Sequence, residues 1–199
     1  MKLVVGLGNP GAEYAASRHN VGFAVADELV ARHRIATEVR FHGRFGETAG
    51  GGIGRFGVLF PHTWMNASGA SVRAAVEVLG LDPARELIVV CDDLDLPPGR
   101  LRLRPRGGSG GHRGLASIGE ALGHGEFPRL RFGIGRPPAG SDVVEYVLAA
   151  FASGEVAALA PAIRRAADAV ECAFSDGVGV AMERYNRAVA DTVEEDPAQ

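Results

Sequence analysis

The stretch Leu87-Ile-Val-Val-Cys-Asp92-Asp93 is an uninterrupted apolar run that ends in two carboxylates. Such a run is typical of a strand buried on both faces, as in a parallel sheet covered by helices. Residues 2–7 form a second apolar run near the start of the chain. Ligands of open α/β sheets bind beyond the carboxyl ends of the strands. Because Asp92 directly follows its strand, it is the first candidate for a functional residue.

Helical and strand patterns alternate outward from these two runs. Apolar residues recur at helical spacing over residues 21–32, and Ser68 and Gly80 are suited to begin and end a helix between them. Further strands are expected at residues 41–48, 53–60, 100–106 and 130–134, and further helices at 115–122, 142–151, 156–174 and 180–187. The alternation, without linker or repeat, predicts one α/β domain over residues 1–190. The acidic segment 191–199 is expected to be a disordered tail.

The composition is that of an ordinary globular domain. The chain has 199 residues, of which 46% are hydrophobic and 23% charged, with a net charge of −3. No apolar run approaches the roughly 18 residues of a membrane helix, and the N-terminal run is too short for a signal peptide. Two cysteines, Cys91 and Cys172, make no disulfide framework. We therefore expect a cytoplasmic protein that has no contact with a membrane.

The charge is unevenly distributed along the chain. Between Gly99 and Arg136, eight arginines face two glutamates, which gives +6 there and leaves −9 for the rest. In a strand, residues 100–106 would place Arg100, Arg102 and Arg104 on one face and Leu101 and Leu103 on the other. Such a local basic field can hold a polyanion on an otherwise acidic body, and ordinary solvated surface arginine is the weaker alternative.

Three further polar residues lie at the ends of other expected elements. His19 precedes the helix expected at 21–32, and Asn9 and Asn66 lie in loops after expected strands. A histidine can serve as a general base near neutral pH, and a carboxylate such as Asp92 could hold its ring in one tautomer. Asparagine side chains both donate and accept hydrogen bonds, so Asn9 and Asn66 could orient a water molecule or bind an oxyanion.

The aspartates after the strand allow other chemistry. Asp92, Asp93 and Asp95 could together hold a magnesium ion, because hard cations prefer clustered carboxylates. Asp93 and Asp95 could also simply cap the turn that follows. Cys91 could act as a nucleophile, but its apolar strand favours a buried, unreactive thiol.

A glycine motif near the N-terminus suggests a different class of protein. Gly6-Leu-Gly8-Asn-Pro-Gly11 matches the G-x-G-x-x-G fingerprint of nicotinamide-dependent oxidoreductases. That fingerprint should open directly into a helix, whereas helical periodicity begins only near Val21. Pro10 also lacks the N–H group that a pyrophosphate would use. The dinucleotide interpretation is therefore the weaker one.

Taken together, these segments closely resemble bacterial peptidyl-tRNA hydrolases. In chain order the resemblance is carried by Leu3–Gly11 with Tyr14, Arg18–Asn20, Pro61–Gly69, Asp92–Gly99, Gly107–Leu115, Arg129–Pro137, and Glu145–Leu148 with Phe151. The resemblance implies a single α/β domain around a twisted, mixed and largely parallel sheet flanked by helices. It also implies a monomeric enzyme that needs no metal, no cofactor and no obligate protein partner.

The activity implied by the resemblance is hydrolysis of the ester between a peptide and the 3′-terminal ribose of tRNA, which recycles tRNA from aborted translation. By resemblance His19 is the catalytic base and Asp92 its partner. Asn9 and Asn66 line the site, and Tyr14 lies beside it.

The resemblance also implies contacts with the 3′ CCA end and acceptor stem of the tRNA. Arg102 and Arg104 occupy positions where the family has basic residues that grip the 5′-phosphate. Arg131 matches a basic residue associated with the tRNA arm near the site. Residues 137–147 resemble a mobile gate over the cleft.

One position departs from the family pattern. The family usually has Asn after the histidine of the Gly-Gly-His loop, where this chain has Arg113. An amide that donates and accepts is thereby replaced by a cation that only donates. Arg113 could bind phosphate or the ester carbonyl, or substrate could be positioned more weakly. A non-catalytic RNA-binding relative of the same fold is therefore the alternative function.

Overall fold

The computed structural model describes residues 1–48 and 53–187. Within them, one mixed sheet has the strand order β2-β3-β4-β1-β5-β7-β6. The strands are β1 (Lys2–Gly6), β2 (Thr37–Arg40), β3 (Gly43–Glu47), β4 (Phe56–Pro61), β5 (Leu87–Asp93), β6 (Leu101–Arg104) and β7 (Arg129–Gly133). The four central strands β4, β1, β5 and β7 run parallel, and β2, β3 and β6 add antiparallel edges. The predicted fold class is confirmed.

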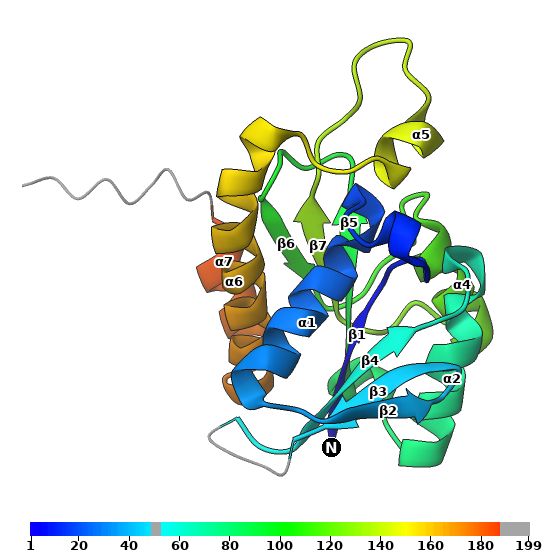
Figure 1. The fold of residues 1–199 in the computed structure, drawn as a ribbon. Helices are drawn as coiled ribbons and strands as arrows, with labels where there is room; N and C mark the ends of the chain where they lie inside the picture. The colour runs from blue at the N-terminus through cyan, green and yellow to red at the C-terminus, as the bar shows by residue number, and fades with distance from the viewer. Residues whose placement is uncertain (49–52, 188–199) are drawn as a thin grey trace, which may run out of the picture.

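Helices cover both faces of the sheet (Figure 1). One face packs against α1 (Val21–His33), α6 (Ser153–Ser175) and α7 (Val178–Tyr185), and the other against α2 (Ser68–Leu79) and α4 (Arg113–Leu122). Alternate residues of β5 enter the two cores: Ile88 and Val90 face α1 and α6, whereas Val89 and Cys91 face the opposite layer. The apolar run is therefore buried on both faces, as its sequence predicts.

The short elements account for most differences from the expected pattern. β2 and the single-turn α3 (Pro83–Glu86) were not predicted, because β2 is largely exposed and lacks an apolar alternation. The strand expected from residue 41 begins at Gly43, since Phe41 and His42 have positive φ angles of 55° and 53° in the turn before it. The strand expected from residue 53 begins at Phe56. The tail predicted at 191–199 lies outside the described residues.

The helices after residue 140 also differ in length from the prediction. α5 spans only Val143–Leu148, and α6 begins at Ser153, earlier than expected, and continues through Pro161. None of the helices that the structure describes combines the length and apolar character that a membrane crossing requires.

A close approach between α1 and the sheet positions the segment that precedes the helix. A Cβ atom added to Gly22 would lie 2.5 Å from the backbone of Leu7 and of Val90. Only glycine permits this contact, which brings the start of α1 against the ends of β1 and β5. The 3-10 turn η2 (Arg18–Asn20) consequently lies at the carboxyl edge of the sheet.

Candidate active site

His19 and Asp92, 73 positions apart in the sequence, meet at this edge of the sheet. The Nδ1 atom of His19, in η2, lies 2.7 Å from Oδ1 of Asp92, near the end of β5. The expected contact between these two side chains is therefore present. Asp92 is only 4% exposed, whereas the imidazole of His19 is 13% exposed.

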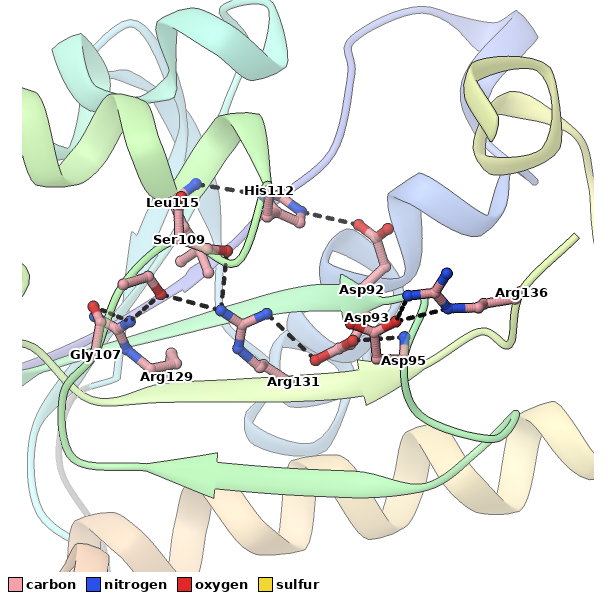
Figure 2. A network of polar contacts seen from close by, with 11 residues as sticks. Asp92, Asp93, Asp95, Gly107, Ser109, His112, Leu115, Arg129, Arg131 and Arg136 are labelled. Atoms are coloured by element: carbon pink, nitrogen blue, oxygen red, sulfur yellow. Dashed lines mark hydrogen bonds and ion pairs between the residues drawn. The ribbon is translucent and has the colours of Figure 1, made fainter. Parts of the chain in front are cut away.

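A second histidine, which the sequence analysis did not single out, binds the same carboxylate (Figure 2). Nε2 of His112 lies 3.0 Å from Oδ1 of Asp92. Its Nδ1 atom accepts hydrogen bonds from the backbone N–H groups of Gly114 and Leu115, at 3.1 and 3.3 Å. Because Nδ1 is an acceptor, the ring proton resides on Nε2 and is donated to Asp92. His112 is the N-cap residue of α4, a position where Ser, Thr, Asp or Asn is usual. The absence of those residues there is the sequence signal that could have identified His112.

The two histidines determine the charge of Asp92. Burial by itself would raise the pKa of this carboxyl, but His112 and His19 outweigh burial and hold its pKa well below the usual range. Asp92 is therefore ionised and accepts the Nδ1–H proton of His19. The lone pair of His19 is then on Nε2, an atom that no described residue binds. An imidazole held this way can accept a proton from a substrate or a water molecule.

The same three residues have the composition of a metal site, but their hydrogen bonds oppose it. The potential ligand atoms of His19, Asp92 and His112 all lie within 4.8 Å of one another. The Nε2 atom of His112 carries a proton, because its Nδ1 atom accepts from two backbone amides. A metal ion would need that atom as a lone-pair donor. The arrangement therefore fits a hydrogen-bonded carboxylate better than a metal centre.

The magnesium alternative at the three aspartates is not supported either. Asp93 pairs with Arg131 at 3.2 Å and also accepts the backbone N–H of Asp95, which is the capping role considered above. Asp95 pairs with Arg136. Figure 2 shows the three carboxylates directed to different partners, so they do not converge on one point.

Asn9 is fixed in the loop after β1 by three hydrogen bonds. Its Oδ1 atom accepts from the backbone N–H of Met65 at 2.9 Å, and its backbone N–H and C=O groups bind the side chain of Asn20 at 2.8 and 2.9 Å. The Nδ2 group of Asn9 has no partner among the described residues and remains available to a ligand. Asn20 is a further residue of the site that sequence reasoning missed.

Asn66 and Tyr14 lie in the loops beside Asn9. Asn66 is exposed in the 3-10 turn η3 (Met65–Ala67), so its amide is accessible. Tyr14, in the turn η1 (Ala12–Tyr14), meets the ring of Trp64 edge-on, with centroids 6.1 Å apart. Trp64 is 58% exposed, which leaves an accessible aromatic surface next to these loops.

The basic segment divides into arginines that hold the fold and arginines that face solvent. Arg129 is 1% exposed and binds backbone carbonyls around Gly107 (Figure 2). Arg131 binds Asp93 and the carbonyls of Gly108 and Ser109, so it holds the loop that leads to His112. The family resemblance associates Arg131 with the tRNA arm, and its contacts show that Arg131 also has a structural role in holding this loop.

Three arginines of the segment have no ion-pair or hydrogen-bond partner in the part of the chain that the structure describes. These are Arg102 and Arg104, exposed on the edge strand β6, and Arg113, exposed at the start of α4. Leu101 and Leu103 are buried on the opposite face of β6, so the predicted alternation is confirmed for residues 101–104. Arg100 precedes the strand instead, and its side chain donates to the backbone carbonyl of Asn186.

The remaining alternatives fail on geometry. Cys91 is fully buried, and burial raises its pKa far above the usual value, so it is no nucleophile. The glycine motif is followed by two 3-10 turns before α1, and a Cβ atom at Gly8 would meet the ring of Phe23 at 2.8 Å. The loop therefore offers no open cradle for a pyrophosphate.

A cavity of about 710 Å³ lies between the turn at Pro97–Gly99 and α6, but neither His19 nor Asp92 lines it.

Comparison with known proteins agrees with this geometry. The sequence model of the family described as peptidyl-tRNA hydrolase matches residues 3–194. A peptidyl-tRNA hydrolase of Symbiobacterium thermophilum is 49% identical over 93% of this chain and 98% of its own length, and one of Chloroflexus aggregans is 48% identical over 94% and 99%. The crystal structure of peptidyl-tRNA hydrolase from Acinetobacter baumannii superposes with a TM-score of 0.86 at 37% identity, covering 94% of each chain. The chain therefore belongs to the peptidyl-tRNA hydrolase family.

Proposed function

We propose that this member of the family hydrolyses the ester between the peptide and the 3′-terminal ribose of peptidyl-tRNA by general-base catalysis at His19, oriented by Asp92. The observation that carries the mechanism is the 2.7 Å contact between Nδ1 of His19 and the buried, ionised carboxylate of Asp92. The contact leaves the Nε2 lone pair of His19 on the side of the ring that faces away from Asp92, where the substrate would bind.

In the reaction one proton moves from water to His19 and then from His19 to the leaving ribose oxygen. Nε2 of His19 takes a proton from water while the water oxygen attacks the ester carbonyl, and Asp92 stabilises the resulting imidazolium. Collapse of the tetrahedral intermediate breaks the bond to the ribose oxygen, which takes the proton from His19. The products are a free peptide carboxyl group and a tRNA with a free 3′-terminal hydroxyl. Base catalysis of this kind supplies about 10²–10⁴-fold of the rate enhancement.

Hydrogen-bond donors beside His19 supply a second contribution. The available Nδ2 group of Asn9 and the exposed amide of Asn66 are suited to bind the oxyanion or to hold the attacking water. Tyr14 with Trp64 offers a surface for the apolar parts of the substrate. A free aminoacyl-tRNA replaces the first peptide amide by an ammonium group, which leaves polar partners in the site unmatched and makes it a poor substrate.

The tRNA would be held by the arginines that the fold does not use. In this proposal Arg102 and Arg104, exposed on β6, bind the 5′-phosphate at the acceptor stem, and Arg113, exposed at the start of α4, binds the phosphates of the CCA end. Arg131 acts mainly by fixing the loop that carries His112. The family resemblance implies that the protein acts on tRNA as a monomer in the cytoplasm.

The test is hydrolysis of a tRNA charged with an N-acetylated amino acid, compared with the same tRNA carrying the unblocked amino acid. We expect the purified protein to release free tRNA from the blocked substrate and to cleave the unblocked one far more slowly. Binding of the blocked substrate without cleavage would instead identify a non-catalytic RNA-binding relative.

A further inference from the structure

The three residues of η2 point to three different parts of the molecule. A 3-10 helix has three residues per turn, so consecutive side chains diverge by about 120°. His19 reaches Asp92, and Asn20 binds the backbone of Asn9. Arg18 turns instead toward residues 146–155 and is only 7% exposed, although the mechanism above assigns it no task.

The guanidinium group of Arg18 is enclosed by the segment that joins α5 to α6. Nη1 donates to the carbonyl of Ala150 at 2.6 Å, and Nη2 donates to Oε2 of Glu155 at 2.7 Å. The guanidinium carbon lies 4.3 Å from the ring centroid of Tyr146 and 5.3 Å from that of Phe151. An arginine that is paired, stacked and largely dehydrated in this way is held in one orientation.

The backbone reinforces the same junction. The N–H group of Arg18 donates to the carbonyl of Ala149 at 3.0 Å, and Ser17 and Ala150 form an isolated antiparallel bridge. The residue before His19 is therefore joined to the α5–α6 segment through both its main chain and its side chain.

Glu155 and Tyr146 connect this junction to the rest of the fold. Glu155 lies in the first turn of α6, and its oxygen that binds Arg18 also accepts the N–H of the N-cap residue Ala152 at 2.7 Å. The Tyr146 hydroxyl donates to the carbonyl of Ile134, just after β7, at 2.7 Å. Figure 1 shows α5 beyond the carboxyl ends of the central strands, on the side of the sheet where η2 lies.

We propose that Arg18 is a positioning residue for His19, and that the docked α5–α6 segment determines the orientation of the imidazole through the Arg18–Glu155 pair. His19 follows Arg18 directly in a turn of three residues. A change in the backbone dihedral angles at Arg18 therefore reorients His19 as well. A misplacement of about 1 Å at a catalytic group can cost on the order of 10²-fold in rate. The proposal rests on the proposed role of His19 as the base.

The test compares substitutions of the pair with a matched arginine elsewhere. Arg18→Met removes the charge and keeps the apolar stem, whereas Glu155→Gln removes the charge but retains an acceptor for Ala152. Arg32→Met is the control, because Arg32 also ties α6 to α1, through Asp168 and Glu171, at the end of α1 far from His19. We expect kcat to fall about tenfold or more in Arg18→Met and less in Glu155→Gln, with KM within about threefold, and no change in Arg32→Met.

A spectroscopic measurement separates positioning from a general loss of structure and from catalysis itself. The Nδ1–H proton of His19 that binds Asp92 should give a downfield NMR signal, assigned by its absence in His19→Gln. We expect this signal to persist in Arg32→Met and to shift or broaden in Arg18→Met and Glu155→Gln. Since the signal needs no turnover, it tests positioning even if the wild-type chain fails to hydrolyse substrate.

Two results would overturn the proposal. One is a wild-type kcat in Arg18→Met; the other is a reduced kcat with an unchanged His19 signal. If Arg18→Met does not fold, Glu155→Gln decides the matter, and a wild-type kcat together with an unshifted signal in that variant rejects the proposal.

Discussion

The Nε2 atom of His112 lies 3.0 Å from Oδ1 of Asp92, and this is the oxygen that His19 also binds. Each ring donates to it, and the rings tilt by 42° with their centroids 5.2 Å apart. The carboxylate is thus held from the loop before α4 as well as from η2. The direction in which Asp92 presents its charge to His19 depends on both.

Asp92→Asn should lower kcat on the order of 10²-fold or more, with a smaller change in KM. An amide at this position can present N–H to His19 and favour the wrong tautomer. Steady-state kinetics with an N-blocked aminoacyl-tRNA measure both constants. A turnover within twofold of wild type would show that the pairing has no part in catalysis.

His112→Ala should reduce both stability and turnover. The N–H groups of Gly114 and Leu115 lose a buried acceptor, which costs about 1–3 kcal/mol, and Asp92 loses a donor, which should lower kcat about tenfold. Urea unfolding and kinetics measure the two effects. His124→Ala is the matched control, because His124 also accepts a backbone N–H, that of Glu126, but is exposed. Equal losses in the two variants would contradict the role given to His112.

The lowered pKa of Asp92 predicts a pH-dependent contribution to stability. A carboxyl whose folded pKa lies below its unfolded value of about 4 stabilises the fold above that pH, and the contribution is lost as pH falls toward the folded pKa. The contribution of Asp92 to the difference in unfolding free energy between wild type and Asp92→Asn should therefore shrink as the pH falls below about 4. Urea titrations across this range measure whether the difference shrinks or grows with acidification. A difference that grows would show that burial outweighs the histidines and raises the pKa of Asp92.

Arg102→Ala combined with Arg104→Ala should weaken tRNA binding and flatten its salt dependence. The logarithm of the tRNA binding constant falls linearly with the logarithm of the salt concentration. Each duplex phosphate that an arginine no longer neutralises makes this negative slope less steep by about 0.9. Binding isotherms at several salt concentrations give this slope. Arg136→Ala is the control, because Arg136 is already paired with Asp95. An unchanged slope in the double variant would place the phosphate-binding residues elsewhere.

Sequence reasoning succeeded where a local pattern carries the information. The apolar run of β5 predicts a strand buried on both faces and so places Asp92 at the edge where ligands bind, and the alternation at Leu101–Arg104 predicts one exposed basic face. It failed where the role of a residue depends on a distant partner. His112 acts through two backbone amides and through Asp92, 20 positions away. From the sequence alone Arg131 resembles an unpaired cation, but the register of β5 and β7 pairs it with Cys91, from where its side chain reaches Asp93.

The central claim is that the imidazole at position 19 takes the proton from the attacking water. The most direct measurement is hydrolysis of an N-blocked aminoacyl-tRNA by His19→Ala, with circular dichroism and tRNA binding measured on the same sample. We predict a folded protein that binds tRNA with near wild-type affinity and has lost at least about 10²-fold in kcat. A folded His19→Ala protein with wild-type turnover would contradict the account.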